Sequence, residues 1–144
     1  MAADRAPRIV LIYGLLGLIP FLAPVMVILV RPDLAAQAAA IQALYGALIL
    51  SFLGGARWGL AVGSTKPDPV TISLSMIPTL IALATLVLLA HAPRLELMAL
   101  ATALLAQWAW DMRAVSAPTW FGRLRTLLTL GAVAGLSAGA WAVG

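Results

Sequence analysis

The sequence predicts an all-α membrane protein, a single domain of residues 1–144 built as a bundle of five transmembrane helices. The chain is 63% hydrophobic and only 10% charged, with a mean hydropathy of +1.05. Soluble domains carry charge on about a quarter of their residues and could not hide this much apolar surface. The apolar residues fall in five long stretches, each close to the roughly 20 residues that a helix needs to cross a bilayer.

The first two spans are predicted at residues 9–30 and 34–63. Pro20 and Pro24 fall inside the first span, where each removes a helix hydrogen bond, so we expect a kink or a loosened turn there. Asp33 suits the N-cap of the second span. That span would measure about 45 Å, longer than a hydrocarbon core, so we expect it to tilt or to project into the interface.

The remaining spans are predicted at residues 70–90, 95–112 and 123–143. A proline-rich turn precedes the third span, and Asp68 in that turn is placed to cap the helix that follows. Pro78 is a further candidate kink. The segment between the last two spans is the longest connection.

Basic residues separate between the two sides of a five-span arrangement. One side holds seven of the nine, namely Arg5, Arg8, Arg57, Lys66, Arg113, Arg123 and Arg125, and the other holds only Arg31 and Arg94. Because positive residues concentrate in cytoplasmic loops, the sequence predicts an N-terminus inside, in the cytoplasm or matrix, and a C-terminus outside. An even number of spans would destroy this separation.

Composition excludes several classes of function. With no cysteine and a single histidine, His91, the chain lacks thiolate metal sites and a paired-histidine haem site. The basic residues are scattered at helix ends rather than gathered in a stripe, so nucleic acid is not an expected partner. We find no metal-binding HExxH, phosphate-binding glycine loop or nucleophile elbow. We therefore expect no enzyme activity, no cofactor and no metal.

Arg57 is the most unusual residue, because it lies about 10 Å inside the end of its span. Gln107 and Asp111 are four residues apart, on one helix face and at the same end of the bundle. An Arg57–Asp111 ion pair would offset the cost of desolvating both charges, so we expect a structural clamp. Two alternatives stay open: an arginine that snorkels to the surface, and a functional site for an anion, a quinone or a proton.

Tryptophans gather at the same end of the predicted bundle. Trp58 and Trp110 are next to the two charged residues of the expected clamp. Membrane proteins carry a belt of aromatic side chains at the interface, which explains most of these residues, and Trp120 and Phe121 are an expected interfacial anchor. A quinone or lipid pocket walled by Trp58 and Trp108 beside Arg57 is the alternative.

Small residues recur at every fourth position in two spans. The second span carries Ala43, Ala47, Ser51, Gly55, Gly59 and Gly63, and the fifth carries Gly131, Gly135 and Gly139. Small side chains let helix backbones approach closely in lipid, so each ladder predicts a close helix crossing, within the chain or with a partner. The alternative is that the glycines permit hinge motion along a substrate path.

Four strings in the chain carry a family resemblance. They are GLIPF at residues 17–21, YGALILSFLGGARWG at 45–59, QWAWD at 107–111 and PTWFGRLRT at 118–126. In this order the chain resembles the family catalogued as domain of unknown function 3429, and its alanine-rich composition is similar to that of the bacterial branch. The resemblance implies a five-helix protein of the bacterial inner membrane, which is an energy-transducing membrane. It does not indicate an activity.

These observations favour a structural or accessory subunit that packs against another membrane protein complex, respiratory or photosynthetic. The small size, the two ladders and the lack of a catalytic motif support this interpretation. A small transporter or channel is one alternative. A quinone- or lipid-binding protein with a site near Arg57 is the other.

Overall fold

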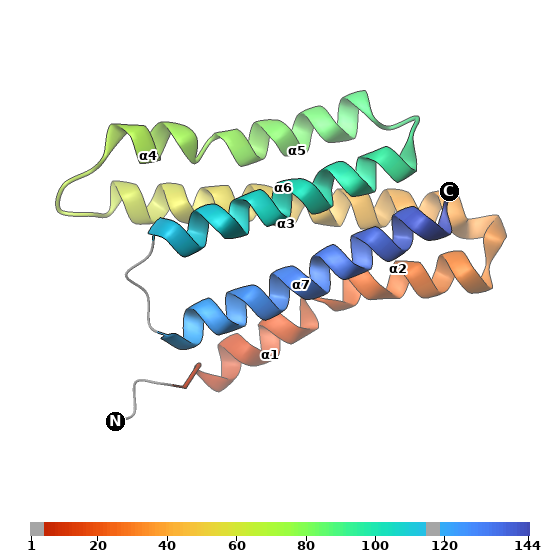
Figure 1. Cartoon of the computed structure of the whole chain (residues 1–144), viewed down its shortest axis with the longest axis horizontal. Coiled ribbons are helices and arrows are strands. Elements are labelled where there is room, and N and C mark those ends of the chain that lie inside the picture. Colours follow the sequence, from red (N-terminus) through yellow and green to blue (C-terminus); the bar gives the residue numbers. More distant parts are fainter. Residues whose placement is uncertain (1–4, 115–118) are drawn as a thin grey trace.

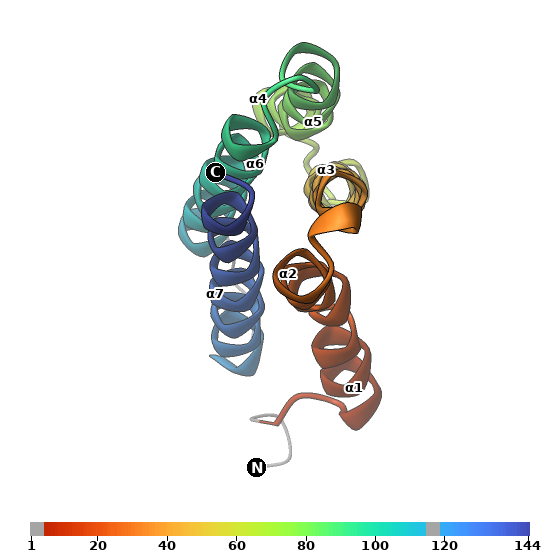
Figure 2. The same ribbon diagram turned by 90° about the vertical axis from the view of Figure 1, so that its right-hand side faces the viewer.

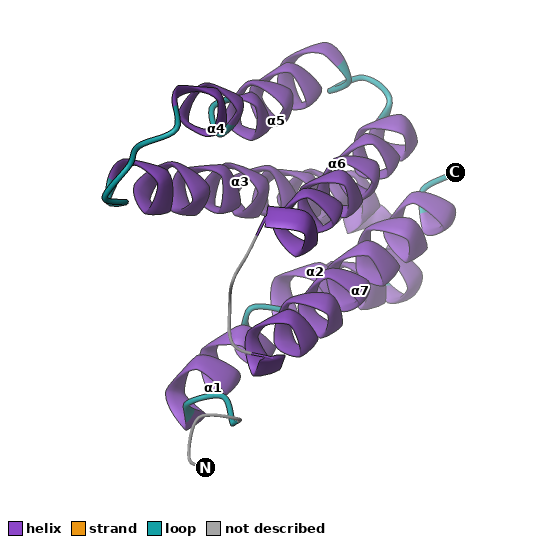
Figure 3. Ribbon diagram, turned by 60° about the vertical axis from the view of Figure 1, so that its left-hand side comes forward, coloured by secondary structure: helices purple, strands orange, loops and turns teal. Residues whose placement is uncertain are grey.

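The computed structural model describes residues 5–114 and 119–144, and within these ranges the chain is helical with no strand (Figure 3). The predicted all-α class is confirmed. The elements in order are α1 (Arg8–Leu16), α2 (Ile19–Val30), the 3-10 turn η1 (Pro32–Leu34), α3 (Ala35–Val62), α4 (Pro69–Leu74), α5 (Ile77–Leu88), α6 (Pro93–Ala114) and α7 (Thr119–Ala142). The longest predicted connection, between α6 and α7, includes residues 115–118, which lie outside the described residues.

Two predicted spans are each divided into two helices near a proline. α1 gives way to α2 just before Pro20, and α4 gives way to α5 just before Pro78. At the first break the Phe21 amide donates to the Leu18 oxygen, and the Gly17 carbonyl accepts from the Tyr45 hydroxyl of α3 at 2.9 Å. The expected interruptions are thus present near Pro20 and Pro78, whereas Pro24 lies within an unbroken α2.

The helices form a bundle of two facing rows. α2 and α3 lie side by side and face α7 and α6, while α5 packs against both α3 and α6 (Figures 1 and 2). α3 and α6 end where α1, α4 and α7 begin, on the left in Figure 1. We call this the arginine-rich end, since it carries Arg8, Arg57, Lys66, Arg113, Arg123 and Arg125. The C-terminus lies at the opposite end.

The surface of the bundle suits a lipid environment. Phe52, Leu60 and Leu88 are 69%, 70% and 74% exposed, and many other large apolar side chains point outward. Four helical segments of the described chain are long and apolar enough to cross a membrane, namely 8–30, 32–62, 69–88 and 119–142. α6 has 22 residues but is not among them, because polar residues lower its hydropathy.

Small residues of α7 bring it very close to α2. A Cβ added at Gly135 would lie 2.6 Å from the Phe21 carbonyl oxygen, and one added at Gly131 would lie 2.9 Å from the Leu18 side chain. Gln42 of α3 is fully buried at the same junction, and its amide donates to the main-chain oxygens of Phe21 and Gly135 at 2.7 and 2.8 Å. Gly139 lies directly against the Gln42 amide. The ladder of the fifth span therefore packs within the chain, where α2, α3 and α7 meet.

The ladder on α3 divides into two parts, because its later members do not pack within the chain. Ala43 and Ala47 are buried and Ser51 is partly buried, but Cβ atoms added at Gly55 and Gly59 would meet nothing within 4 Å. A four-residue step advances by about 40° around an α-helix, so the four steps from Ala43 to Gly59 turn the ladder by about 160°. Gly63 follows the end of α3 and is exposed. The buried face continues instead through Leu50, Gly54 and Arg57.

Candidate functional site

A buried carboxylate at the arginine-rich end gathers polar groups from two other helices. Asp111 of α6 is 6% exposed, and its Oδ1 accepts a hydrogen bond from Gln107 Nε2 at 3.0 Å. Its Oδ2 accepts from Nε and Nη2 of Arg125, at 3.2 and 3.1 Å. Arg57 of α3 completes the group, with its Nε 3.7 Å from Asp111 Oδ1. We call Arg57, Gln107, Asp111, Arg125 and Thr129 the arginine cluster.

Helix geometry explains why these side chains converge. Gln107 and Asp111 are one turn apart on α6, and Arg125 and Thr129 are one turn apart on α7, so each pair shares a helix face. Within α7, Arg125 Nη1 donates to the Thr129 hydroxyl at 2.7 Å, which fixes the guanidinium toward α6. Between the two helices, Trp108 Nε1 donates to the Thr126 hydroxyl at 3.0 Å. The α6–α7 pair therefore holds the carboxylate and one arginine rigidly.

Arg57 is bound less completely than Arg125. Arg57 is 9% exposed, and its guanidinium, including the buried Nε, makes no hydrogen bond within the described residues. Its contacts are the 3.7 Å approach to Asp111 and the ring of Trp110, whose centroid lies 4.2 Å from the guanidinium carbon. A cation over an indole face is attracted by the ring quadrupole. Arg57 is thus buried and close to an anion, but its N–H donors are unused.

The structure brings together Arg57, Gln107, Asp111 and Trp110, as the sequence predicts, and adds two residues that the sequence analysis missed. Arg125 is the principal cationic partner of Asp111, and Thr129 orients it. The signal for both was the four-residue spacing of Arg125 and Thr129 at the end that also holds Asp111. Trp58 does not join the cluster, because its side chain points outward and is 44% exposed.

The charges of the cluster do not balance. Two guanidinium groups face one carboxylate, and the side chains of Arg57, Arg125 and Asp111 are 10%, 11% and 8% exposed. Of the other described acidic residues, Asp33 pairs with Arg31, Asp68 caps α4, and Glu96 lies in the first turn of α6 at the opposite end. The described part of the cluster therefore carries one excess positive charge, and a buried charge without a counter-ion is costly.

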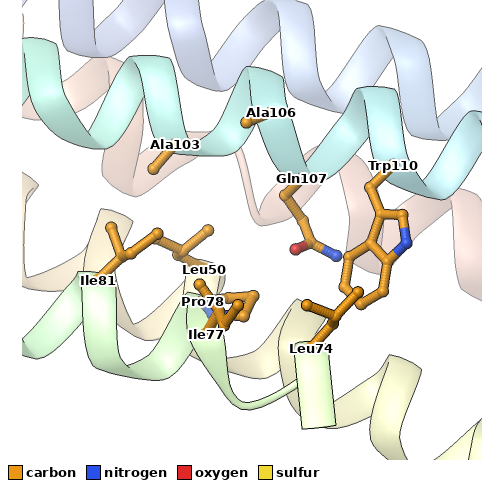
Figure 4. A pocket seen from close by; sticks show the side chains of 9 residues that line it. All are labelled: Leu50, Leu74, Ile77, Pro78, Ile81, Ala103, Ala106, Gln107 and Trp110. Atoms are coloured by element: carbon orange, nitrogen blue, oxygen red, sulfur yellow. The ribbon is translucent and has the colours of Figure 1, made fainter. Parts of the chain in front are cut away.

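Two apolar cavities adjoin the cluster. The Gln107 cavity has a volume of about 240 Å³, and the Gln107 amide and the Trp110 indole close one of its ends (Figure 4). Its walls come from Leu50, Leu74, Ile77, Pro78, Ile81, Ala103 and Ala106. The Arg125 cavity is larger, about 520 Å³, and lies between α1, α2, α3, α6 and α7 with Arg125 and Thr129 in its wall.

The arrangement can bind an anion or a polar headgroup beside an apolar tail. Among residues 5–114 and 119–144, no three histidine, aspartate or glutamate side chains gather as metal ligands. The cluster supplies instead hydrogen-bond donors and one surplus positive charge next to apolar walls, which are the features of a binding or structural site.

Comparison with known proteins agrees with the resemblance in the sequence. Residues 6–141 match the family described as "Protein of unknown function (DUF3429)". Transmembrane protein 69 of Xenopus tropicalis is 38% identical over 139 residues, which cover 92% of this chain and 53% of that protein. Transmembrane protein 69 of Mus musculus is 37% identical over 84 residues, covering 56% of this chain and 34% of the mouse protein. No solved structure matches the chain.

The chain spans about half the length of the Xenopus relative and about a third of the mouse relative. The family match covers nearly the whole chain, and the relatives' names agree with its apolar helices in identifying a membrane protein. The chain therefore belongs to the DUF3429 family of membrane proteins, the family that its four sequence strings indicate.

Proposed function

We propose that the chain is a five-span protein of the bacterial inner membrane, with its N-terminus inside, that acts as a structural or accessory subunit of a larger membrane complex. The open glycine face of α3 is the observation that carries this proposal. The span count, the orientation and the docking surface each have their own support.

The fifth span of the proposal is α6. Its 22 residues would measure about 33 Å, enough to cross a hydrocarbon core. Two of the residues that lower its hydropathy, Gln107 and Asp111, are 4% and 6% exposed, and Asp111 accepts hydrogen bonds from Gln107 and Arg125 inside the bundle. Polar groups that face the interior of a bundle and are paired there are compatible with a membrane span. With five spans, the basic residues segregate as the positive-inside rule requires.

The docking surface is the outer face of α3 near the arginine-rich end. Large side chains at Ile41, Leu44, Leu48 and Phe52 are 50–69% exposed along this face, and Gly55 and Gly59 then interrupt the row. Added Cβ atoms at these glycines would meet nothing within 4 Å, so the backbone of α3 lies open there. Because helices in lipid associate through such small residues, a helix of another membrane protein could approach α3 at this notch.

Purification in mild detergent, followed by identification of co-purifying membrane proteins, tests this function. We expect a defined partner with the unmodified protein and its loss when Gly55 and Gly59 are both replaced by leucine. The melting temperature of the isolated protein should not fall, because Cβ atoms added at these positions would meet no atom within 4 Å and leucine favours a helix more than glycine does. Loss of the partner without loss of stability would support a docking face.

Ala84 provides the matched control, since it is also small and exposed but lies on α5, away from the notch. Ala84→Leu should keep the partner. The accessory function would be wrong if no membrane protein co-purifies, or if the double glycine variant keeps the same partner as Ala84→Leu.

A further inference from the structure

We propose that the arginine cluster binds the phosphate of an anionic phospholipid, with Arg57 as the principal contact and an acyl chain in the Arg125 cavity. This binding does not require the accessory function proposed above, because Arg57 lies on the inward face of α3 whereas Gly55 and Gly59 lie on its outward face. Three observations support it: the unused N–H donors of Arg57, the excess positive charge of the cluster, and an apolar cavity that Arg125 and Thr129 of the cluster line.

The N–H donors of Arg57 have no acceptors within the described residues. The residue is more than nine-tenths buried, and its guanidinium makes no hydrogen bond within the described residues. An arginine presents a planar fork of N–H groups that matches the oxygens of a phosphate. Stacking on Trp110 holds this fork in place but satisfies none of its N–H groups. A bound phosphate would supply the missing acceptors.

The excess charge selects an anion rather than a neutral headgroup. Asp111 is already hydrogen-bonded by Gln107 and Arg125, so its negative charge is shared between two arginines. No other described carboxylate pairs with the cluster. One further negative charge would balance it, and basic pockets between helices at the cytoplasmic side are sites where anionic lipid headgroups bind.

The Arg125 cavity identifies the anion as part of a lipid. Its volume of about 520 Å³ falls within the range of about 300–1,000 Å³ typical of small-molecule sites, and its lining is almost entirely apolar. The cavity begins at Arg125 and Leu124 near the arginine-rich end and reaches Phe21 and Ala132 deeper in the bundle. An acyl chain would follow this direction from a headgroup held at the cluster. A free phosphate ion would leave the cavity unused.

The depth of the cluster agrees with this placement. Leu53 of α3 lines the cavity, and Arg57 follows it by one turn, about 6 Å further toward the end of the helix. Asp111 of α6 similarly lies about 10 Å beyond Leu104, which also lines the cavity. Arg57 and Asp111 thus sit on the headgroup side of the cavity, as a phospholipid requires.

The test compares thermal stability in nanodiscs of phosphatidylcholine with and without phosphatidylglycerol, and measures lipid retained on the protein by native mass spectrometry. We expect phosphatidylglycerol to raise the melting temperature of the unmodified protein and to remain bound after detergent extraction. Arg57→Gln should lose both effects. The measured quantity is the difference in melting temperature between the two lipid compositions. It can therefore be interpreted even if Arg57→Gln is less stable overall.

Arg123→Gln is the matched control, because Arg123 is exposed at the same end of the bundle. This substitution removes one positive charge, as Arg57→Gln does, but outside the cluster. It should keep the phosphatidylglycerol effect. Equal losses in Arg57→Gln and Arg123→Gln would show general surface attraction and overturn the site. In detergent without lipid, inorganic phosphate should not stabilise the protein. If it stabilises the protein as much as phosphatidylglycerol does, the lipid assignment is wrong.

Discussion

Gly135 of α7 lies against the main-chain carbonyl of Phe21 in α2, so closely that a Cβ at position 135 would be 2.6 Å from that oxygen. The clash would be with backbone, which cannot move aside as a flexible side chain can. We therefore expect Gly135→Leu to lower the free energy of unfolding by at least the cost of overpacking, about 1–3 kcal/mol. Thermal unfolding in detergent measures the change.

Gly59→Leu is the comparison for this experiment, since its side chain would enter open space. Its melting temperature should not fall below that of the unmodified protein. If both variants melt alike, the contact between α2 and α7 is looser than the structure indicates.

The strength of the two arginine–aspartate contacts should differ. Arg125 makes two hydrogen bonds to Asp111, whereas Arg57 approaches it to 3.7 Å without one. Removing one partner of a buried pair can cost about 3–5 kcal/mol, less where water reaches the site. In double-mutant cycles with alanine, we expect the Arg125–Asp111 coupling energy to exceed the Arg57–Asp111 coupling energy. Strictly additive changes for both pairs would exclude the clamp.

Asp68 gives the protein an acid-sensitive turn. Hydrogen bonds from the Thr71 hydroxyl at 2.6 Å and the Thr71 amide at 3.0 Å lower the pKa of this carboxyl below its ordinary 3.8. A lowered pKa means that the stabilisation is complete above pH 3.8 and is lost as the pH falls through the folded value. Asp68→Asn keeps an acceptor oxygen but cannot titrate.

Melting curves of the two proteins between neutral pH and about pH 2 check this prediction. The advantage of the unmodified protein over Asp68→Asn should be constant at neutral pH and shrink below pH 3.8. An advantage that does not change with pH would mean that the cap does not depend on the charge of Asp68.

Single cysteines test the topology, because the natural chain contains none. Lys66 lies in the turn between α3 and α4 and His91 in the turn between α5 and α6, at opposite ends of the bundle, and both are exposed. A membrane-impermeant maleimide should label His91→Cys in intact cells and Lys66→Cys only after the membrane is permeabilised. Labelling of both from one side would refute the five-span arrangement.

The sequence predicted the arginine cluster in part, for reasons that particular residues make clear. Arg57 and Asp111 stood out because charges inside apolar spans are rare. Arg125 did not stand out, because it lies near the start of its span, where basic residues commonly mark the cytoplasmic interface. Its side chain is held inward by hydrogen bonds to Thr129 and Asp111. The spacing of Arg125 and Thr129 is visible in the sequence, but the contact with Asp111 on another helix is not.

The two ladders of small residues differ in how far they turn around their helices. Gly131, Gly135 and Gly139 span two steps, so they drift by only about 80° and stay on the face that meets α2 and α3. On α3 the drift continues for more steps and carries the ladder from the core to the surface. Four of the five predicted spans were predictable from hydropathy, whereas α6 is less apolar, and the divisions of the first and third spans lie near Pro20 and Pro78.

Arg57 and the glycines on either side of it, Gly55 and Gly59, are two positions apart and so point in directions about 200° apart around α3. No rotation of α3 about its axis could turn Arg57 and the two glycines toward the same neighbouring helix. Deleting or inserting one residue between Leu50 and Gly54 would turn everything beyond it by about 100°, taking Arg57 away from Asp111 and Gly54 away from Pro78, beside which it packs. Many single substitutions on the outer face of α3 leave its inner contacts untouched, but a change in its length alters every contact past the point of change.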